Sequence, residues 1–211
     1  MNDQEFDTAL VAAAFSLGAE AGWRKVSPAA AARHAGLDLP RARSRFACTA
    51  SILKKFGQLA DAAALTGALE DGPVRDRLFD ILLRRFDFLQ THRQGVLALM
   101  KFLPACPPLA FCLAELNIVS MGWLLEGAGV PSTGLRGALA KRGLLLVWAY
   151  GAKAWAQDET EDLTATMAAV DKALTRADSL AARFTPAAGK APRSEVEEAE
   201  EHSPEAPPAV E

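Results

Sequence analysis

Three arginines stand close together in one short segment of the chain. Arg41, Arg43 and Arg45 alternate with small residues. A guanidinium group donates hydrogen bonds in a planar fork, which suits phosphate oxygens and the edges of guanine bases. On a helix, Arg41, Ser44 and Arg45 would share one side, with Arg43 nearby. The chemistry of this segment is therefore that of polyanion binding.

The sequence around these arginines is strongly basic. Between residues 22 and 60 there are eight Lys or Arg residues and one acid, Asp38, although the net charge of the whole chain is −3. Such a local excess of positive charge is an electrostatic signature of nucleic-acid binding. The candidate phosphate contacts outside the arginine segment are Arg24, Lys25, Lys54 and Lys55.

Local signals place the arginines on the second of two short helices. Ser27 and Pro28 are typical of a helix start, and residues 29–35 follow as a short helix. Gly36 suits a turn with positive φ, and Asp38 is a good cap for the next helix. This pattern predicts a helix-turn-helix, whose second helix normally lies in the DNA major groove, where Arg41, Ser44 and Arg45 would face the bases. The alternative is a solvated basic helix in a small helical bundle.

At these residues the chain resembles the N-terminal domain of the TetR family of bacterial repressors. The matching features are a first helix from Ala9 to the Gly22-Trp23 pair, the turn Ala35-Gly36-Leu37, Phe46 at the end of the recognition helix, and a fourth helix from Thr49. The family's Tyr-x-Tyr-Phe ending is replaced by Arg43-Ser44-Arg45-Phe46, so arginines would take over the phosphate contacts of the tyrosines. The resemblance covers about sixty residues. Independently of it, Asn2 and Glu5 have the pattern of a capping box, which predicts the start of the first helix.

The resemblance implies an all-α, TetR-like fold of about nine helices. It would have a helix-turn-helix DNA-binding domain over residues 1–66 and a helical ligand-binding and dimerisation domain over residues 73–184. A periodic helix from Pro73 opens the second domain, and we expect its arginines, including Arg85, to lie mostly outside. Residues 185–211 are rich in Pro, Ala and Glu, which predicts a disordered acidic tail.

The last two predicted helices carry more apolar residues than one surface helix needs. The helix over residues 135–156 is apolar nearly all round, and the last helix, capped by Asp158 and Glu161, has a regular apolar seam. Such a pair would suit a symmetric four-helix dimer interface, unless the two helices pack only within one subunit. In a homodimer, two recognition helices about 34 Å apart would read a palindromic operator in double-stranded DNA.

The second domain also has the residues of a small-molecule pocket. Methionine and aromatic walls with a few polar groups are typical of sites for apolar ligands between helices. The candidate ligand-binding residues are Met100, Phe111, Glu115, Asn117, Met121, Trp123 and Trp148. The aromatic residues can equally be ordinary core, and Glu115 can simply face solvent. A buried, unpaired Glu115 would need a partner or a ligand.

No pattern of catalytic or metal-binding residues is found in the sequence. The three histidines lie in different predicted elements, without acid or cysteine partners at metal-ligand spacing, and no phosphate-binding or dinucleotide-binding glycine loop is complete. We therefore expect no enzyme, no cofactor and no metal. Three cysteines at unrelated spacings favour free thiols and a reducing, cytoplasmic location. Prolines and polar residues in the most apolar region argue against a transmembrane helix.

A looser likeness connects the chain to coenzyme Q biosynthesis proteins that have a TetR-like fold and bind isoprenoid lipids. The matching pieces are Pro40-Arg41-Ala42-Arg43, Lys141-Arg142, and Trp155 with Asp158 and Thr164. The departures are Val130 in place of an acid, Ala138 and Leu139 in place of aromatics, and an acidic tail in place of an amphipathic helix. This likeness implies a second hypothesis, in which the chain is a lipid-binding accessory protein of ubiquinone synthesis rather than a DNA-binding regulator.

Overall fold

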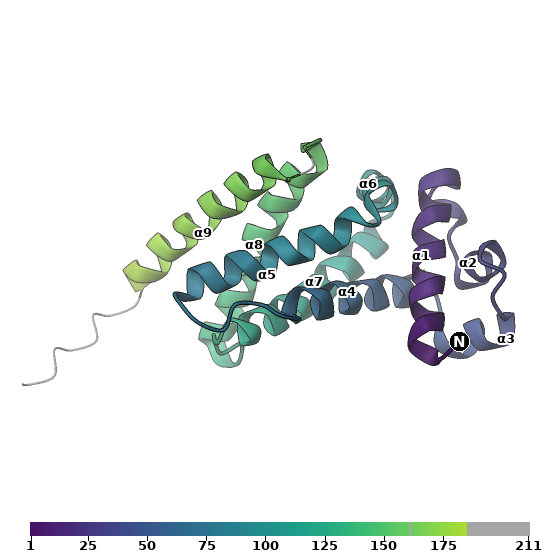
Figure 1. The fold of residues 1–211 in the computed structure, drawn as a ribbon, viewed down its shortest axis with the longest axis horizontal. Coiled ribbons are helices and arrows are strands. Elements are labelled where there is room, and N and C mark those ends of the chain that lie inside the picture. The colour runs from purple at the N-terminus through teal and green to yellow at the C-terminus, as the bar shows by residue number, and fades with distance from the viewer. Residues whose placement is uncertain (161, 185–211) are drawn as a thin grey trace, which may run out of the picture.

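The computed structural model describes residues 1–160 and 162–184, and this part of the chain is all-helical (Figure 1). The predicted cap Glu161 and the predicted tail 185–211 lie outside the described residues. Two short 3₁₀ turns, η1 and η2, span Trp23–Lys25 and Leu103–Ala105. The helices are α1 Asp3–Ala21, α2 Pro28–His34, α3 Leu39–Arg45, α4 Thr49–Leu65, α5 Val74–Gln90, α6 Arg93–Phe102, α7 Pro107–Gly127, α8 Gly134–Gln157 and α9 Thr164–Phe184.

The N-terminal helices begin at the caps that the sequence predicts. The Asn2 side chain accepts a hydrogen bond from the Glu5 amide at 2.8 Å, and Glu5 returns one to Asn2. The Ser27 hydroxyl accepts from the Ala30 amide, and the Asp38 carboxylate accepts from the Arg41 amide at 2.8 Å. These side chains satisfy amides that have no partner inside their helices.

The nine described helices form a small N-terminal group and a larger bundle that share one helix. In Figure 1, α1 stands across one end of the bundle, with α2 and α3 on its far side. Helix α4 begins against α1 and continues into the bundle, where it packs on α5 and α7. The two regions predicted from the sequence are therefore joined by a continuous core, not only by a linker.

Helices α8 and α9 pack against each other, and α9 also contacts α5. The first part of the apolar seam predicted for α9 lies inside the subunit, where Leu163, Val170 and Leu174 are buried. The side chains of Ala181 and Phe184, which end the predicted seam, lie outside the described part of the structure. Buried Asp158 accepts hydrogen bonds from the Thr160 hydroxyl and from the amide and hydroxyl of Thr166. Burial alone would raise the pKa of Asp158, but these bonds outweigh it and lower the pKa to about 2.

Helix α7 is long and apolar enough to span a membrane. One such helix is weak evidence of a membrane protein, because core helices can have the same length and composition. The prolines interrupt the apolar region before α7 begins, because α6 ends at Phe102 and Pro104 lies in η2. Pro107 occupies the first turn of α7, where proline is tolerated. One part of α7, around Met121 and Leu124, is buried in the core. Other large apolar residues of α7, Phe111 and Trp123 among them, are more than 60% exposed.

Candidate nucleic-acid interface and adjoining cavity

Helices α2 and α3 form the predicted helix-turn-helix. Gly36 adopts φ 64°, and the Leu37 amide donates to the Ala32 carbonyl at 2.8 Å, which closes the turn. Ala42 and Phe46 anchor α3 because both are buried in the core. The solvent-facing side of α3 includes Arg43. A short helix is thus held by its apolar side and presents the opposite side outward.

The structure places Arg41 and Arg45 on the protein's own carboxylates. Arg41 pairs with Asp3 at 2.5 Å, and Arg45 pairs with both Asp3 and Asp7. Arg41 also lies over the Phe6 ring, 4.6 Å from its centroid. The two guanidinium groups therefore hold α3 against α1, whereas both were expected to be free for contacts with DNA bases.

Asp7 is the buried centre of this ion-pair network. It is 3% exposed, and Lys55 reaches its second oxygen at 2.9 Å. The hydrogen bond from Arg45 is the largest effect that lowers the pKa of Asp7, and the bond from Lys55 adds to it. The charged carboxylate is thus stabilised despite its burial. Lys55, expected on a phosphate, is committed to this contact.

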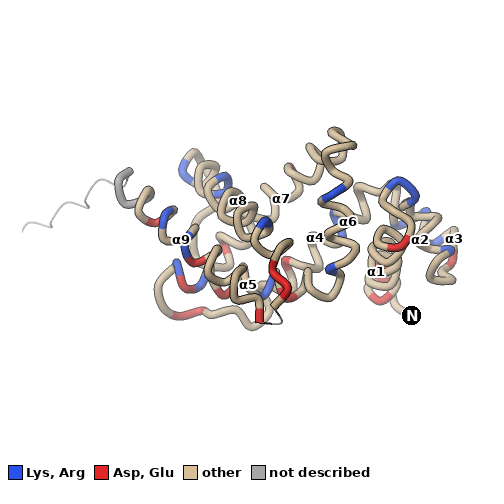
Figure 2. Tube along the Cα trace, turned by 90° about the horizontal axis from the view of Figure 1, so that it is seen from above, with Lys and Arg blue, Asp and Glu red and all other residues tan. Residues whose placement is uncertain are grey.

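Other cations of the region lie on the surface. Arg24, Lys25, Arg33 and Arg43 are exposed, and among the described residues no acid lies within ion-pair distance of them. Figure 2 shows basic positions on α2 and α3 beside acidic positions on α1. The exposed Ser44 hydroxyl donates to the Arg41 carbonyl at 2.8 Å. The available positive charge is therefore carried by groups other than Arg41 and Arg45.

A cavity of about 220 Å³ lies between α4, α5, α6, α7 and α8. Four of the predicted ligand-binding residues line it, namely Met100, Asn117, Trp123 and Trp148. The other three do not: Phe111 and Glu115 are exposed, and Met121 is fully buried in the core. Lys54, expected on a DNA phosphate, is exposed and also lines the cavity.

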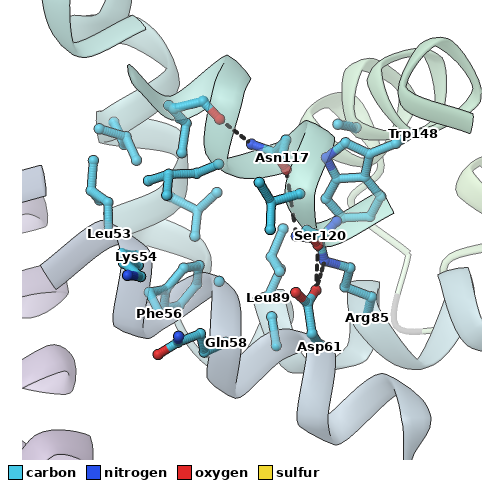
Figure 3. A pocket seen from close by; sticks show the side chains of 18 of the residues that line it. Leu53, Lys54, Phe56, Gln58, Asp61, Arg85, Leu89, Asn117, Ser120 and Trp148 are labelled. Atoms are coloured by element: carbon cyan, nitrogen blue, oxygen red, sulfur yellow. Dashed lines mark hydrogen bonds and ion pairs between the residues drawn. The ribbon is translucent and has the colours of Figure 1, made fainter. Parts of the chain in front are cut away.

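Polar groups gather at one end of this cavity (Figure 3). Arg85 is 4% exposed, and its Nε lies 3.2 Å from the Asp61 carboxylate. Its Nη2 donates to the Asn117 side-chain oxygen at 3.4 Å, and its guanidinium stacks over Trp148 at 4.3 Å. Desolvation lowers the pKa of Arg85, and Asp61 opposes that effect.

The prediction that Arg85 lies outside is wrong. Arg85 follows Ile81 and Leu82 and precedes Leu89 at helical spacing, so it falls on the buried stripe of α5. Asp61 and Ser120, which share a hydrogen bond of 2.5 Å at this end of the cavity, were not predicted either. The helical spacing of Arg85 from the apolar residues of α5 was the one sequence signal that it is buried, because its partners are distant in sequence.

Solved structures of bacterial regulators share this arrangement of helices. A TetR transcriptional regulator from Nitrosomonas europaea matches with 19% identity over 83% of this chain and 99% of its own, at a TM-score of 0.63. A putative TetR-family regulator from Syntrophomonas wolfei matches with 11% identity over 88% and 100%, at 0.56. A TetR-family regulator from Streptomyces coelicolor matches with 21% identity over 88% and 85%, at 0.53. The chain has the TetR fold. No protein-family sequence model and no curated protein sequence matches it.

Within this TetR fold, α6 connects the cavity to the helix-turn-helix region. Val96 and Met100 of α6 line the cavity. Gly95 packs directly on α1, since a Cβ there would come within 2.4 Å of the Phe15 carbonyl oxygen. The Trp23 indole donates to the Gly95 carbonyl at 2.9 Å. A ligand that displaces α6 would therefore also displace α1.

A cluster of aromatic rings lies beside this contact. Phe15 of α1 stacks on Phe56 of α4 with centroids 4.0 Å apart, and His92, just before α6, lies 5.7 Å from Phe15. Burial lowers the pKa of His92, so its imidazole is neutral at pH 7. The junction between the two parts of the TetR fold is thus apolar, tightly packed and uncharged.

Proposed function

We propose that the chain is a cytoplasmic, homodimeric transcriptional regulator that binds a palindromic operator in double-stranded DNA and responds to a small apolar effector. The observation that carries this proposal is the helix-turn-helix with exposed cations on and around α3. The TetR fold of the solved regulators supports the same class of function. These features together favour a nucleic-acid partner.

The structure suggests a division of roles among the basic residues. Arg43 and Ser44 are on the exposed side of α3 and would face base edges, while Arg24 and Lys25 would contact phosphates. Arg41 and Arg45 would act indirectly, since their ion pairs fix the position of α3 on α1. Direct contact of these two with DNA would require phosphates to replace Asp3 and Asp7.

The effector would act through the packing of α6 on α1. A ligand in the cavity touches α6, and α6 touches α1 at Gly95. If the ligand prefers one position of α6, it shifts the population towards one position of the attached helix-turn-helix. The coupling is reciprocal, so operator DNA would change the affinity for the ligand by the same factor.

The first test is binding to operator DNA chosen by selection from a random duplex library. Affinity is measured by fluorescence anisotropy at several salt concentrations between about 50 and 200 mM. We expect enrichment of a palindromic sequence and a steep fall in affinity with salt. Arg43→Ala should remove about 1–3 kcal/mol of sequence preference, because a base contact is lost. Arg176→Ala, an exposed arginine of α9, is the matched control and should bind as the unaltered protein does.

Two outcomes would contradict this proposal. Absence of binding at the lowest salt would exclude a DNA-binding regulator. Equal effects of Arg43→Ala and Arg176→Ala would exclude α3 as the reading element. If, in addition, mass spectrometry of extracted protein finds an isoprenoid lipid, the alternative role in ubiquinone synthesis takes its place.

A further inference from the structure

The cavity contains a buried donor without a partner. Among the described residues, no acceptor forms a hydrogen bond with the Nη1 or Nε atoms of Arg85. The Nε atom is within ion-pair distance of Asp61, but its N–H direction does not suit a hydrogen bond. An unsatisfied donor in an apolar site is costly, and the cost is larger for a charged group. A ligand acceptor at this end of the cavity would remove that cost.

The other polar groups at this end already have partners. Asp61 accepts from Ser120, and the Asn117 amide nitrogen donates to the Leu113 carbonyl at 2.9 Å. The positive charge of Arg85 is balanced by Asp61. The site therefore offers a donor but no excess of positive charge.

This balance of charge discriminates between possible ligand heads. A carboxylate placed at Arg85 would be buried next to Asp61, and a like charge in an apolar cavity is strongly unfavourable. A neutral carbonyl oxygen accepts the hydrogen bond without adding a charge. Lys54, at the opposite end in Figure 3, is exposed and cannot replace Arg85 as the partner of a buried group.

The size of the cavity limits the part of the ligand that it can enclose. An apolar cavity of about 150 Å³ holds one benzene molecule. The 220 Å³ available here would thus hold roughly ten non-hydrogen atoms. Its walls are mostly apolar, with Phe56, Leu89, Leu99 and Trp148 among them. A long-chain lipid would not be enclosed.

We propose that the effector is a small, uncharged, apolar molecule of roughly ten heavy atoms whose carbonyl oxygen accepts a hydrogen bond from Arg85. Medium-chain ketones, lactones and esters are of this class. The proposal deepens the proposed function, because it rests on the cavity being the effector site. It assigns to Arg85 the role of selecting the ligand head.

Three probes of nearly equal length test the proposal: 2-nonanone, nonane and nonanoate. Binding to the purified full chain, without DNA, is followed by tryptophan fluorescence, since Trp123 and Trp148 line the cavity. We expect 2-nonanone to bind at least roughly tenfold more tightly than either of the others, as one hydrogen bond to a charged donor implies. Equal binding of 2-nonanone and nonane would overturn the proposal, as would preference for nonanoate or absence of binding by all three.

The variant that isolates the donor changes both members of the ion pair. Arg85→Met alone would leave Asp61 buried without its cation, so Arg85→Met is combined with Asp61→Asn, and folding is checked by circular dichroism. In this double variant the preference for 2-nonanone over nonane should disappear, while nonane binds within about threefold of its original affinity. Persistence of the ketone preference would show that another group makes the contact.

A second readout separates this inference from the proposed function. The operator-binding assay is repeated with 2-nonanone present. Ketone binding by a protein that does not bind DNA would remove the regulatory function but leave the ligand assignment intact. DNA binding by a protein that accepts none of the probes would leave the regulatory function intact and remove the ligand assignment.

Discussion

At the scale of single residues, Asp7 decides whether the recognition helix stays in place. It is buried and holds the ends of Arg45 and Lys55, which belong to α3 and α4. One carboxylate of α1 therefore joins three helices. Opposite charges that are 38 or more residues apart in sequence make this network, so it cannot be recognised from the basic segment alone.

Asp7→Asn should lower the free energy of unfolding by about 1–3 kcal/mol at pH 7, since charged partners lose their acceptor. The folded-state pKa of Asp7 lies below its ordinary value of 3.8. Its contribution is therefore complete above that value and is lost as the pH falls through the folded pKa. Urea unfolding at pH 7 and at a series of values below 5 measures both effects. The variant should lose less stability on acidification than the unaltered chain.

The exposed Asp178 of α9 provides the matched control for this residue. Asp178→Asn should change the free energy of unfolding by less than about 0.5 kcal/mol, as surface substitutions usually do. A loss of stability at pH 7 equal to that of Asp7→Asn would show that the network has no special role.

At the scale of elements, α6 contacts α1 so closely at Gly95 that there is no room for a Cβ atom. Gly95→Ala would place a methyl group against the Phe15 backbone and separate the two helices. We expect a loss of about 1–3 kcal/mol of stability from overpacking. We also expect a reduced effect of the effector on DNA affinity, because the contact that transmits it is disturbed. Thermal unfolding and DNA binding with and without 2-nonanone measure the two quantities.

Gly143 of α8 is the control for the intrinsic effect of alanine in a helix. A Cβ at Gly143 would meet no atom within 4 Å. Gly143→Ala should therefore stabilise the protein by about 0.5–1 kcal/mol and leave the coupling unchanged. If Gly95→Ala behaved in the same way, close packing of α6 on α1 would not be the route of coupling.

The elements themselves could be predicted from sequence where the deciding interactions are local. The caps at Asn2, Ser27 and Asp38 act within three residues, so the helix starts were predicted correctly. Roles set by tertiary contacts were predicted less well. Arg45 was expected to be free, because its partner Asp7 lies 38 residues away and outside the basic segment. Arg85 was expected on the outside of α5, because a charged residue is rarely placed in a core.

The residues of the cavity show the same difference between features that local sequence predicts and features that tertiary contacts decide. The residue types typical of a pocket were recognised, but only part of the set lines it. Asn117 and Glu115 lie two residues apart on α7, and this spacing directs them to different sides of the helix. Only Asn117 reaches the cavity. Composition therefore predicted that α7 contributes to a site, while the face could be assigned only once its neighbours were placed.

At the scale of the whole molecule, the exposed apolar residues indicate where a second copy would bind. Leu135, Leu139, Leu146 and Tyr150 are all exposed on α8, at spacings of four, seven and four residues. This is the spacing of a helix-packing seam. The apolar seam of α9 is used inside the subunit, so α8 is the better candidate for the centre of a symmetric interface than the predicted pair of α8 and α9.

Leu146→Asp should convert a dimer into a monomer, because a charge would be buried on both sides of the symmetric contact. Light scattering should then find the chain mass of 22.4 kDa instead of twice that value. Leu69→Asp is the control, since Leu69 is also exposed but lies in the loop after α4. The monomer should remain helical and lose most of its affinity for the palindrome, because two linked recognition helices bind far more tightly than one. A Leu146→Asp protein that stays dimeric and binds DNA normally would move the interface away from α8.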